Sequence, residues 1–229
     1  MGQHFLPGTP PVPLQLRVSA RARRITLRIS SLDGTVTLTR PKSVPEREAL
    51  AFAREKEAWL RGHLAGQAEA VTVAPGAVIP IEGQLRRIEP GQGRSVVLEG
   101  DRLCVPGDPS RCAARVAGFL KARARARLAA ASDRYAAALG RPYSRLTLRD
   151  TRSRWGSCTA QGALMYSWRL ILAPPEVLDY VAAHEVAHLQ EMNHSAAFWA
   201  VVSDLYGPYK PARRWLRDEG AALHRIRFE

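Results

Sequence analysis

The 229-residue sequence contains no run of 18 or more apolar residues. A membrane-spanning helix needs about 20 of them, so this absence excludes a helical span. The first residues, MGQHFLPGTPPVPLQLR, also lack the apolar stretch of a secretory signal. We therefore expect a cytoplasmic protein with no membrane partner. The hydrophobic content of 46% is enough for one good core or two small ones.

Cysteine is equally scarce. Only Cys104, Cys112 and Cys158 are present, an odd number at unrelated spacings. This pattern fits neither a disulfide framework nor a cysteine-based zinc site, and a reducing cytoplasm is the simplest compartment for it. A nucleophilic role for Cys158 is disfavoured because its segment contains no histidine to activate the thiol.

Acidic residues are outnumbered, with 21 against 34 lysines and arginines and a net charge of +13. Residues 111–154 hold twelve of the basic residues against two acids, Asp133 and Asp150. This segment is either the solvated surface of an arginine-rich helix, which we favour, or a phosphate-binding surface for nucleic acid or nucleotides. No aromatic residue interrupts the alternating run 121–127, so that run does not indicate base stacking.

The chain divides, by pattern, into a flexible leader at 1–13, a β-rich N-terminal domain with one helix at 14–107, and an α+β C-terminal domain at 108–229. The boundary is expected near Gly107. Alternating and turn-forming residues predict strands at 14–18, 24–30 and 34–40, a hairpin turn at Asp33-Gly34, a helix at 45–64, and two hairpins within 71–105.

The second half predicts an α+β domain. A long helix should run from 109 to 139 and end at Gly140, with Pro142 beyond it. Further expected elements are a strand at 145–149, a loop at 151–162, a strand at 163–168, a helix beginning near Pro174-Pro175, and two helices at 195–206 and 210–222 separated by Gly207-Pro208.

The most informative motif is His184-Glu185-Val186-Ala187-His188. On a helix, two histidines four residues apart lie on one face, one turn apart, so both imidazoles can bind one metal ion. Glu185 projects beside them, where it would take a proton from a zinc-bound water as general base. The apolar residues Leu178, Ala182, Val186 and Leu189 predict the helix independently of the motif.

A third protein ligand is needed to leave one position open for water. His194 is the preferred candidate if the chain turns after His188, with Asn193 in a left-handed conformation and Ser195 as the N-cap of the next helix. Asp204, on that next helix, is the first alternative, and Glu191 is the second.

Several segments resemble the YgjP-like metallopeptidase-domain family, relatives of the SprT-like zincins. They are Arg152-Ser-Arg-Trp-Gly-Ser-Cys158, Leu164-Met-Tyr-Ser-Trp-Arg-Leu170, Asp179 to Leu189, Asn193-His-Ser195 and Phe198-Trp199, with further likeness in 21–40 and 56–60. The resemblance implies a zincin-like C-terminal catalytic domain with a small mixed sheet. It also implies a zinc ion held by His184, His188 and His194, with Glu185 as base.

Three further residues are candidates for cleft or transition-state contacts: Arg154, Trp155 and Tyr209. Arginine and tyrosine can donate to a developing oxyanion, and Trp155 lies in a tight turn near the expected cleft. Tyr206 and Arg213 are weaker candidates of the same kind.

The residues favour a zinc-dependent metallopeptidase acting on polypeptide, with the strand at 163–168 as a candidate edge for pairing an extended substrate. One alternative is a metal-dependent hydrolase of nucleoside triphosphates, although no glycine-rich phosphate loop is present. Another is a DNA-associated protease acting on nucleic-acid-bound protein, as the SprT-like relatives and the basic segment 111–154 indicate.

Overall fold

The structure is a computed structural model that describes residues 3–30, 34–65 and 70–228. The chain forms two compact units, residues 1–69 and residues 70–229, and each is described by itself. Both units mix short sheets with helices, in agreement with the expected α+β class.

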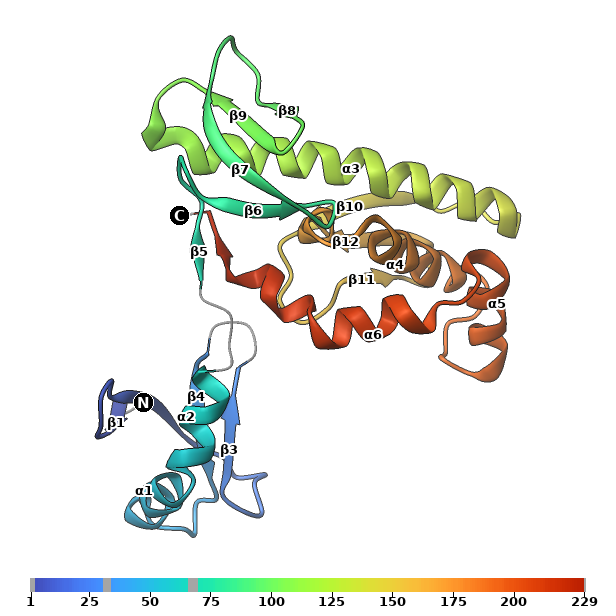
Figure 1. Cartoon of the computed structure of the whole chain (residues 1–229). Helices are drawn as coiled ribbons and strands as arrows, with labels where there is room; N and C mark the ends of the chain where they lie inside the picture. The colour runs from blue at the N-terminus through green and yellow to red at the C-terminus, as the bar shows by residue number, and fades with distance from the viewer. Residues whose placement is uncertain (1–2, 31–33, 66–69, 229) are drawn as a thin grey trace. The chain divides into compact units, whose positions relative to one another are not determined.

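The N-terminal unit is a four-stranded sheet covered on one face by two helices (Figure 1). Its elements are β1 (Gln3–Leu6), β2 (Val12–Val18), β3 (Thr26–Ile29), β4 (Val36–Arg40), α1 (Glu46–Glu55) and α2 (Glu57–Ala65), with sheet order β1-β2-β4-β3. Alternation in β2 and β4 points Leu14, Leu16 and Leu38 to one face, where Ala53 and Leu60 of the helices bury them.

Two expectations for this unit change. The proposed leader is structured from Gln3 onward, because β1 pairs with β2 and Leu6 is buried in the core. The single helix at 45–64 is two helices that meet at Lys56. The hairpin between β3 and β4 is confirmed by their antiparallel pairing, whereas Asp33 of its turn lies outside the described residues.

The second unit begins with strands that we had assigned to the N-terminal domain. They are β5 (Val71–Thr72), β6 (Val78–Ile81), β7 (Gln84–Gly91), β8 (Val97–Glu99) and β9 (Arg102–Pro106). The last four form two antiparallel hairpins, as expected, which are joined by parallel pairing of β7 with β9. Their buried residues, among them Ile79, Ile88 and Leu103, share one core with the following helix. The boundary therefore lies at residues 69–70 and not near Gly107.

That following helix is α3 (Cys112–Leu139), preceded by the 3-10 turn η1 (Pro109–Arg111). It ends where predicted, at Gly140, whose φ of 68° closes the last turn in the left-handed conformation. A buried stripe along α3 packs on the rest of the unit: Val116, Leu120, Ala124, Leu128, Ala131 and Tyr135.

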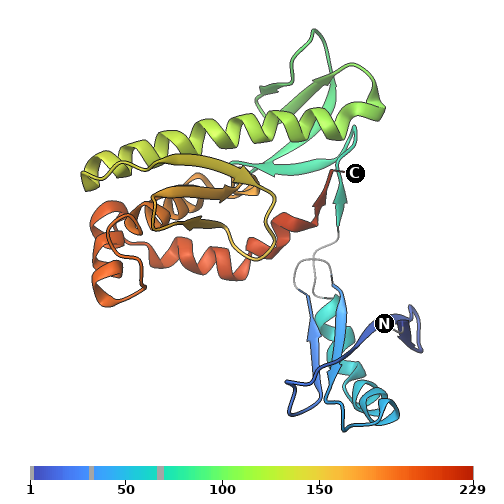
Figure 2. The same ribbon diagram turned by 180° about the vertical axis from the view of Figure 1, so that it is seen from behind.

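A three-stranded sheet lies beside α3 (Figure 2). It contains β10 (Arg145–Arg149), β11 (Gly156–Cys158) and β12 (Ala163–Ser167), in the order β10-β12-β11. The segment predicted as a loop, 151–162, therefore includes a short strand. As a result β12 is central, and the expectation that 163–168 offers a free edge is wrong. The two edge strands of this sheet are β10 and β11.

The remaining elements complete the second unit. They are the 3-10 helix η2 (Trp168–Leu172), α4 (Pro175–Ala187), α5 (Ala196–Tyr206), α6 (Lys210–Asp218), the 3-10 helix η3 (Gly220–Arg225) and β13 (Ile226–Arg227). β13 pairs in parallel with β5, which ties the last strand to the first strand of the unit. Among the described residues, no helix is both long and apolar enough to cross a bilayer.

Candidate metal centre

Helix α4 carries the first two histidines of the site. It starts at Pro175, as the Pro174-Pro175 pair predicted, and its last helical residue is Ala187. His188 keeps helical backbone angles as the C-cap, so the one-turn spacing from His184 is preserved. Most of α4 is buried, including Glu185 and Val186, so the helix is held firmly against α3.

The chain leaves α4 earlier than expected. The helix ends before His188, and the turn does not use a left-handed Asn193. Glu82 is the one non-glycine residue with positive φ in the described part of the chain. Ser195 does cap α5, because its hydroxyl accepts a hydrogen bond from the Phe198 amide at 3.4 Å. This cap starts α5 directly after His194.

The turn brings the three histidines together. Their candidate ligand nitrogens all lie within 4.8 Å of one another, and the Nε2 atoms of His184 and His194 are 3.1 Å apart. Neither Glu191 nor Asp204, the alternative third ligands, belongs to this group. Instead, the Glu191 carbonyl oxygen accepts a hydrogen bond from the Nδ1–H group of His188, at 2.9 Å. That bond leaves Nε2 of His188 with a free lone pair facing the cluster.

The chemistry of this cluster fits a divalent metal such as Zn²⁺. Burial, with the neighbouring histidines His188 and His194, lowers the pKa of His184 to about 3. Burial also lowers the pKa of His188. These two imidazoles are therefore neutral at pH 7, the form that ligates metal. Three imidazoles form a donor set typical of catalytic zinc, which leaves a fourth position open.

Glu185 lies in the same pocket and is only 6% exposed. Burial raises the pKa of its carboxyl to about 8, although the charge of Arg154 opposes the rise. Its carboxylate packs against the backbone of β11 at Gly156. A methyl group placed on Gly156 would lie 2.5 Å from Oε1 and 2.6 Å from Cγ of Glu185. Only glycine leaves room for the carboxylate at this position.

The pocket has a volume of about 350 Å³. Strand β11 forms one wall and the histidines form the other. The lining residues are Arg154, Gly156, Ser157, Cys158, His184, Glu185, His188, Met192 and His194. Met192 is 48% exposed at the mouth, and the sequence offered no signal for it because it sits in an irregular turn.

Two aromatic side chains of α5, Phe198 and Trp199, pack against the histidines. Phe198 lies 4.9 Å from His184, 4.5 Å from His188 and 4.7 Å from His194 between ring centroids. Trp199 lies 5.7 Å from both His184 and His194. The fully buried ring of Phe198 packs against all three imidazoles and restricts their rotation.

The three candidate contact residues divide into two groups. Arg154 lines the pocket, as expected. Trp155 and Tyr209 do not line it. The ring of Trp155 packs on His224 with centroids 5.1 Å apart, and the ring of Tyr209 stacks on Trp199 with centroids 5.0 Å apart, so Trp199 lies between Tyr209 and the histidines. Cys158 does line the pocket, but burial and then the charge of Glu185 raise its thiol pKa to about 11, which disfavours a nucleophilic thiolate.

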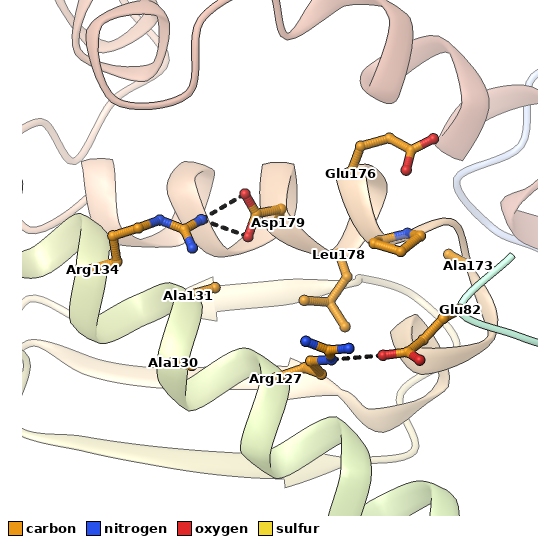
Figure 3. A pocket seen from close by; sticks show the side chains of 10 residues that line it. Glu82, Arg127, Ala130, Ala131, Arg134, Ala173, Glu176, Leu178 and Asp179 are labelled. Carbon is orange, nitrogen blue, oxygen red and sulfur yellow. Dashed lines mark hydrogen bonds and ion pairs between the residues drawn. The ribbon is translucent and has the colours of Figure 1, made fainter. Parts of the chain in front are cut away.

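Three arginines of the basic segment 111–154 form ion pairs within the second unit. Figure 3 shows Arg127 bound to Glu82 and Arg134 bound to Asp179. These four residues line a pocket of about 260 Å³, together with Ala130, Ala131 and Leu178. Arg123 also binds Glu82, at 2.6 Å. These ion pairs join α3 to the turn between β6 and β7 and to α4.

Comparisons with known proteins identify the family of the chain. A family model described as "YgjP-like, metallopeptidase domain" matches residues 23–219. Among solved structures, part of the chain is similar to the metallopeptidase zymogen abylysin of Pyrococcus abyssi. The identity is 18% and the TM-score 0.37, covering 41% of this chain and 95% of that one. No curated protein matches. With the family model spanning most of its length, the chain belongs to the YgjP-like metallopeptidase-domain family.

Proposed function

We propose that this protein is a zinc-dependent metallopeptidase in which His184, His188 and His194 hold the metal and Glu185 is the general base. The observation that carries the proposal is the convergence of three imidazoles and one buried carboxylate on a single pocket, within a metallopeptidase-family domain. The free cysteines fit a reducing compartment, so we place the activity in the cytoplasm.

His184, His188 and His194 would hold the Zn²⁺ ion, which would supply Lewis acidity to a substrate carbonyl and to water. The chain's own residues supply the proton transfers. Glu185 is the one carboxylate that lines the pocket, and within the described residues no ion pair or hydrogen bond engages its side chain. Burial raises the pKa of this carboxyl to about 8, and a cation held by the nearby imidazoles would lower it, so that the carboxylate could accept a proton from the attacking water and deliver it to the leaving amine. Arg154, at the rim, is available to orient the substrate carbonyl.

Strand β11 is the feature that favours a polypeptide substrate. It is an edge strand, and its three residues line the pocket opposite the histidines. Unpaired backbone groups on an edge strand can bind an extended peptide as an added strand. Nucleoside triphosphates, the alternative substrate, would need cationic groups at the pocket, and Arg154 is the single lysine or arginine among its lining residues.

The test compares wild type with Glu185→Gln and His188→Ala on two substrates, an unfolded labelled polypeptide and a nucleoside triphosphate. We expect wild type to carry about one zinc per chain by elemental analysis and to cleave the polypeptide. Glu185→Gln should keep the metal and lose turnover by roughly 10²-fold or more. His188→Ala should lose the metal.

Three results would overturn parts of this proposal. A wild-type protein that is fully folded and contains no metal would show that the three histidines are not metal ligands. Full activity in Glu185→Gln would remove Glu185 from the mechanism. Phosphate release that depends on Glu185, without peptide cleavage, would replace the polypeptide with a phosphoanhydride substrate.

A further inference from the structure

The N-terminal unit carries a second concentration of positive charge, separate from segment 111–154. Residues 1–45 contain seven lysines and arginines and one acid, Asp33, which lies outside the described residues. None of the four strands contains an acidic residue. The charge is therefore nearly uncompensated in the local sequence.

Strand register places part of this charge on the sheet face that the helices leave open. Arg17 of β2, Thr39 of β4 and Thr26 of β3 form one row across the sheet. Gln15, Thr37 and Arg28 form the next row on the same face. The alternate residues, such as Leu16 and Leu38, point to the opposite face and are buried under α1 and α2.

Two further features lie on or beside this face. Phe5 of β1 pairs with Pro13 in the row beyond Gln15 and is 58% exposed. The connection 19–25, between β2 and β3, adds three exposed arginines next to the row of Arg17: Arg21, Arg23 and Arg24. We name the set of Phe5, Arg17, Arg28 and the connection 19–25 the arginine face.

The guanidinium groups of the arginine face are available for a ligand. All five of its arginines are exposed, and none has an ion pair or side-chain hydrogen bond within residues 3–30, 34–65 and 70–228. The contrast with helix α3 is direct, since Arg123, Arg127 and Arg134 are all held by carboxylates of their own unit.

We propose that the arginine face binds single-stranded nucleic acid. Arg17 and Arg28 stand two strands apart, roughly 10 Å across the sheet, with hydroxyl and amide side chains between them. Such a surface lets a flexible phosphate backbone lie across the strands, while the exposed ring of Phe5 offers a base a stacking partner. The arginine face is a sheet surface, and it offers no helix that would enter the groove of a duplex because α1 and α2 pack on the opposite face.

The experiment measures binding of the full-length protein to a labelled 15-nucleotide single strand, as DNA and as RNA, over a range of salt concentrations. The double variant Arg17→Gln/Arg28→Gln removes two cations from the face. The charge-matched control, Arg111→Gln/Arg125→Gln, removes two exposed cations from the basic segment of the other unit. Phe5→Ala removes the ring without changing charge. Circular dichroism checks that each variant is folded.

We expect wild type to bind with an affinity that falls steeply with salt. Arg17→Gln/Arg28→Gln should reduce the slope of log K against log salt by about 1.4, from two lost phosphate contacts at ~0.7 each. Phe5→Ala should weaken binding about tenfold and leave the slope unchanged. The affinity of the control variant Arg111→Gln/Arg125→Gln for the oligonucleotide should lie within about twofold of the wild-type affinity at 0.15 M salt.

Four outcomes would overturn the proposal. They are no binding of either strand at low salt, equal losses in the two double variants, tighter binding of a 15-base-pair duplex than of the single strand, and binding of anionic vesicles or of a poly-glutamate peptide in preference to the oligonucleotides. The readout is independent of peptidase activity, so it stands whether or not the proposed function holds.

Discussion

The close contact between Gly156 and Glu185 yields a sharp prediction for Gly156→Ala. The added methyl carbon would meet Glu185 at 2.5 Å from Oε1, 2.6 Å from Cγ and 2.8 Å from Cδ, where ordinary contacts begin at 3.4 Å. Either the side chain or β11 must move by roughly 0.8 Å to relieve the overlap with Cγ. Glu185 is 6% exposed and cannot swing into solvent, so the displacement falls on the proposed general base or on strand β11.

We expect two effects of this substitution. Overpacking should lower the free energy of unfolding by about 1–3 kcal/mol, which in a unit of this size lowers Tm by roughly 3–10 °C. A catalytic group displaced by nearly 1 Å should lower kcat by about 10²-fold. Cleavage of an unfolded labelled polypeptide and thermal unfolding, measured on the same preparation, give both quantities.

Gly118→Ala is the matched control. Gly118 is an exposed residue inside α3, and a methyl group there meets no atom within 4 Å. The same chemical change should therefore stabilise the protein by about 0.5–1 kcal/mol and leave kcat unchanged. Wild-type Tm and wild-type kcat in Gly156→Ala would refute the close packing of Glu185 on β11.

Two further predictions concern an ion pair and the metal. Burial alone would raise the pKa of Glu82, but hydrogen bonds from Arg123 and Arg127 lower it below its ordinary 4.5. Glu82→Gln should therefore cost roughly 1–2 kcal/mol at pH 7 by urea unfolding, with solvent screening at the 58% exposed Arg127 keeping the value low. Because the folded-state pKa is lowered, this stability is present above pH 4.5 and is lost as the pH falls through the folded-state pKa. A gap between wild type and variant that does not shrink as the pH is lowered from 7 into the acid range would contradict the pairing. For the metal, Zn²⁺ at 100 times its Kd should stabilise chelator-treated wild type by about 2.7 kcal/mol and should not stabilise His188→Ala.

The sequence determined those parts of the site that depend on local spacing. His184 and His188 share a helix face because 3.6 residues make a turn, whatever the rest of the chain does. The start of α4 at Pro175, the end of α3 at Gly140 and the cap at Ser195 follow from short-range backbone chemistry, and all three are confirmed.

The path between His188 and His194 was less predictable. We expected Asn193 to break the helix, yet α4 ends at Ala187 without a left-handed residue. The Glu191 carbonyl binds His188 in this turn, an interaction between two residues on an irregular path. Local propensity could indicate that a turn was needed, but not its backbone angles.

Tertiary structure alone decided which surfaces meet. The strand signals in 71–105 predict a buried face and do not say what covers it, so the strands could be assigned to the wrong unit until Ile79 and Leu103 were seen beside α3. β11 is three residues long and too short for any periodicity, yet it displaces β12 from the edge and confines Glu185. The sequence by itself determined the relative placement of His184, Glu185 and His188, because that depends on neighbours along one helix. The cleft wall, the role of each arginine and the open sheet face depend on contacts between distant segments, which only the folded chain sets.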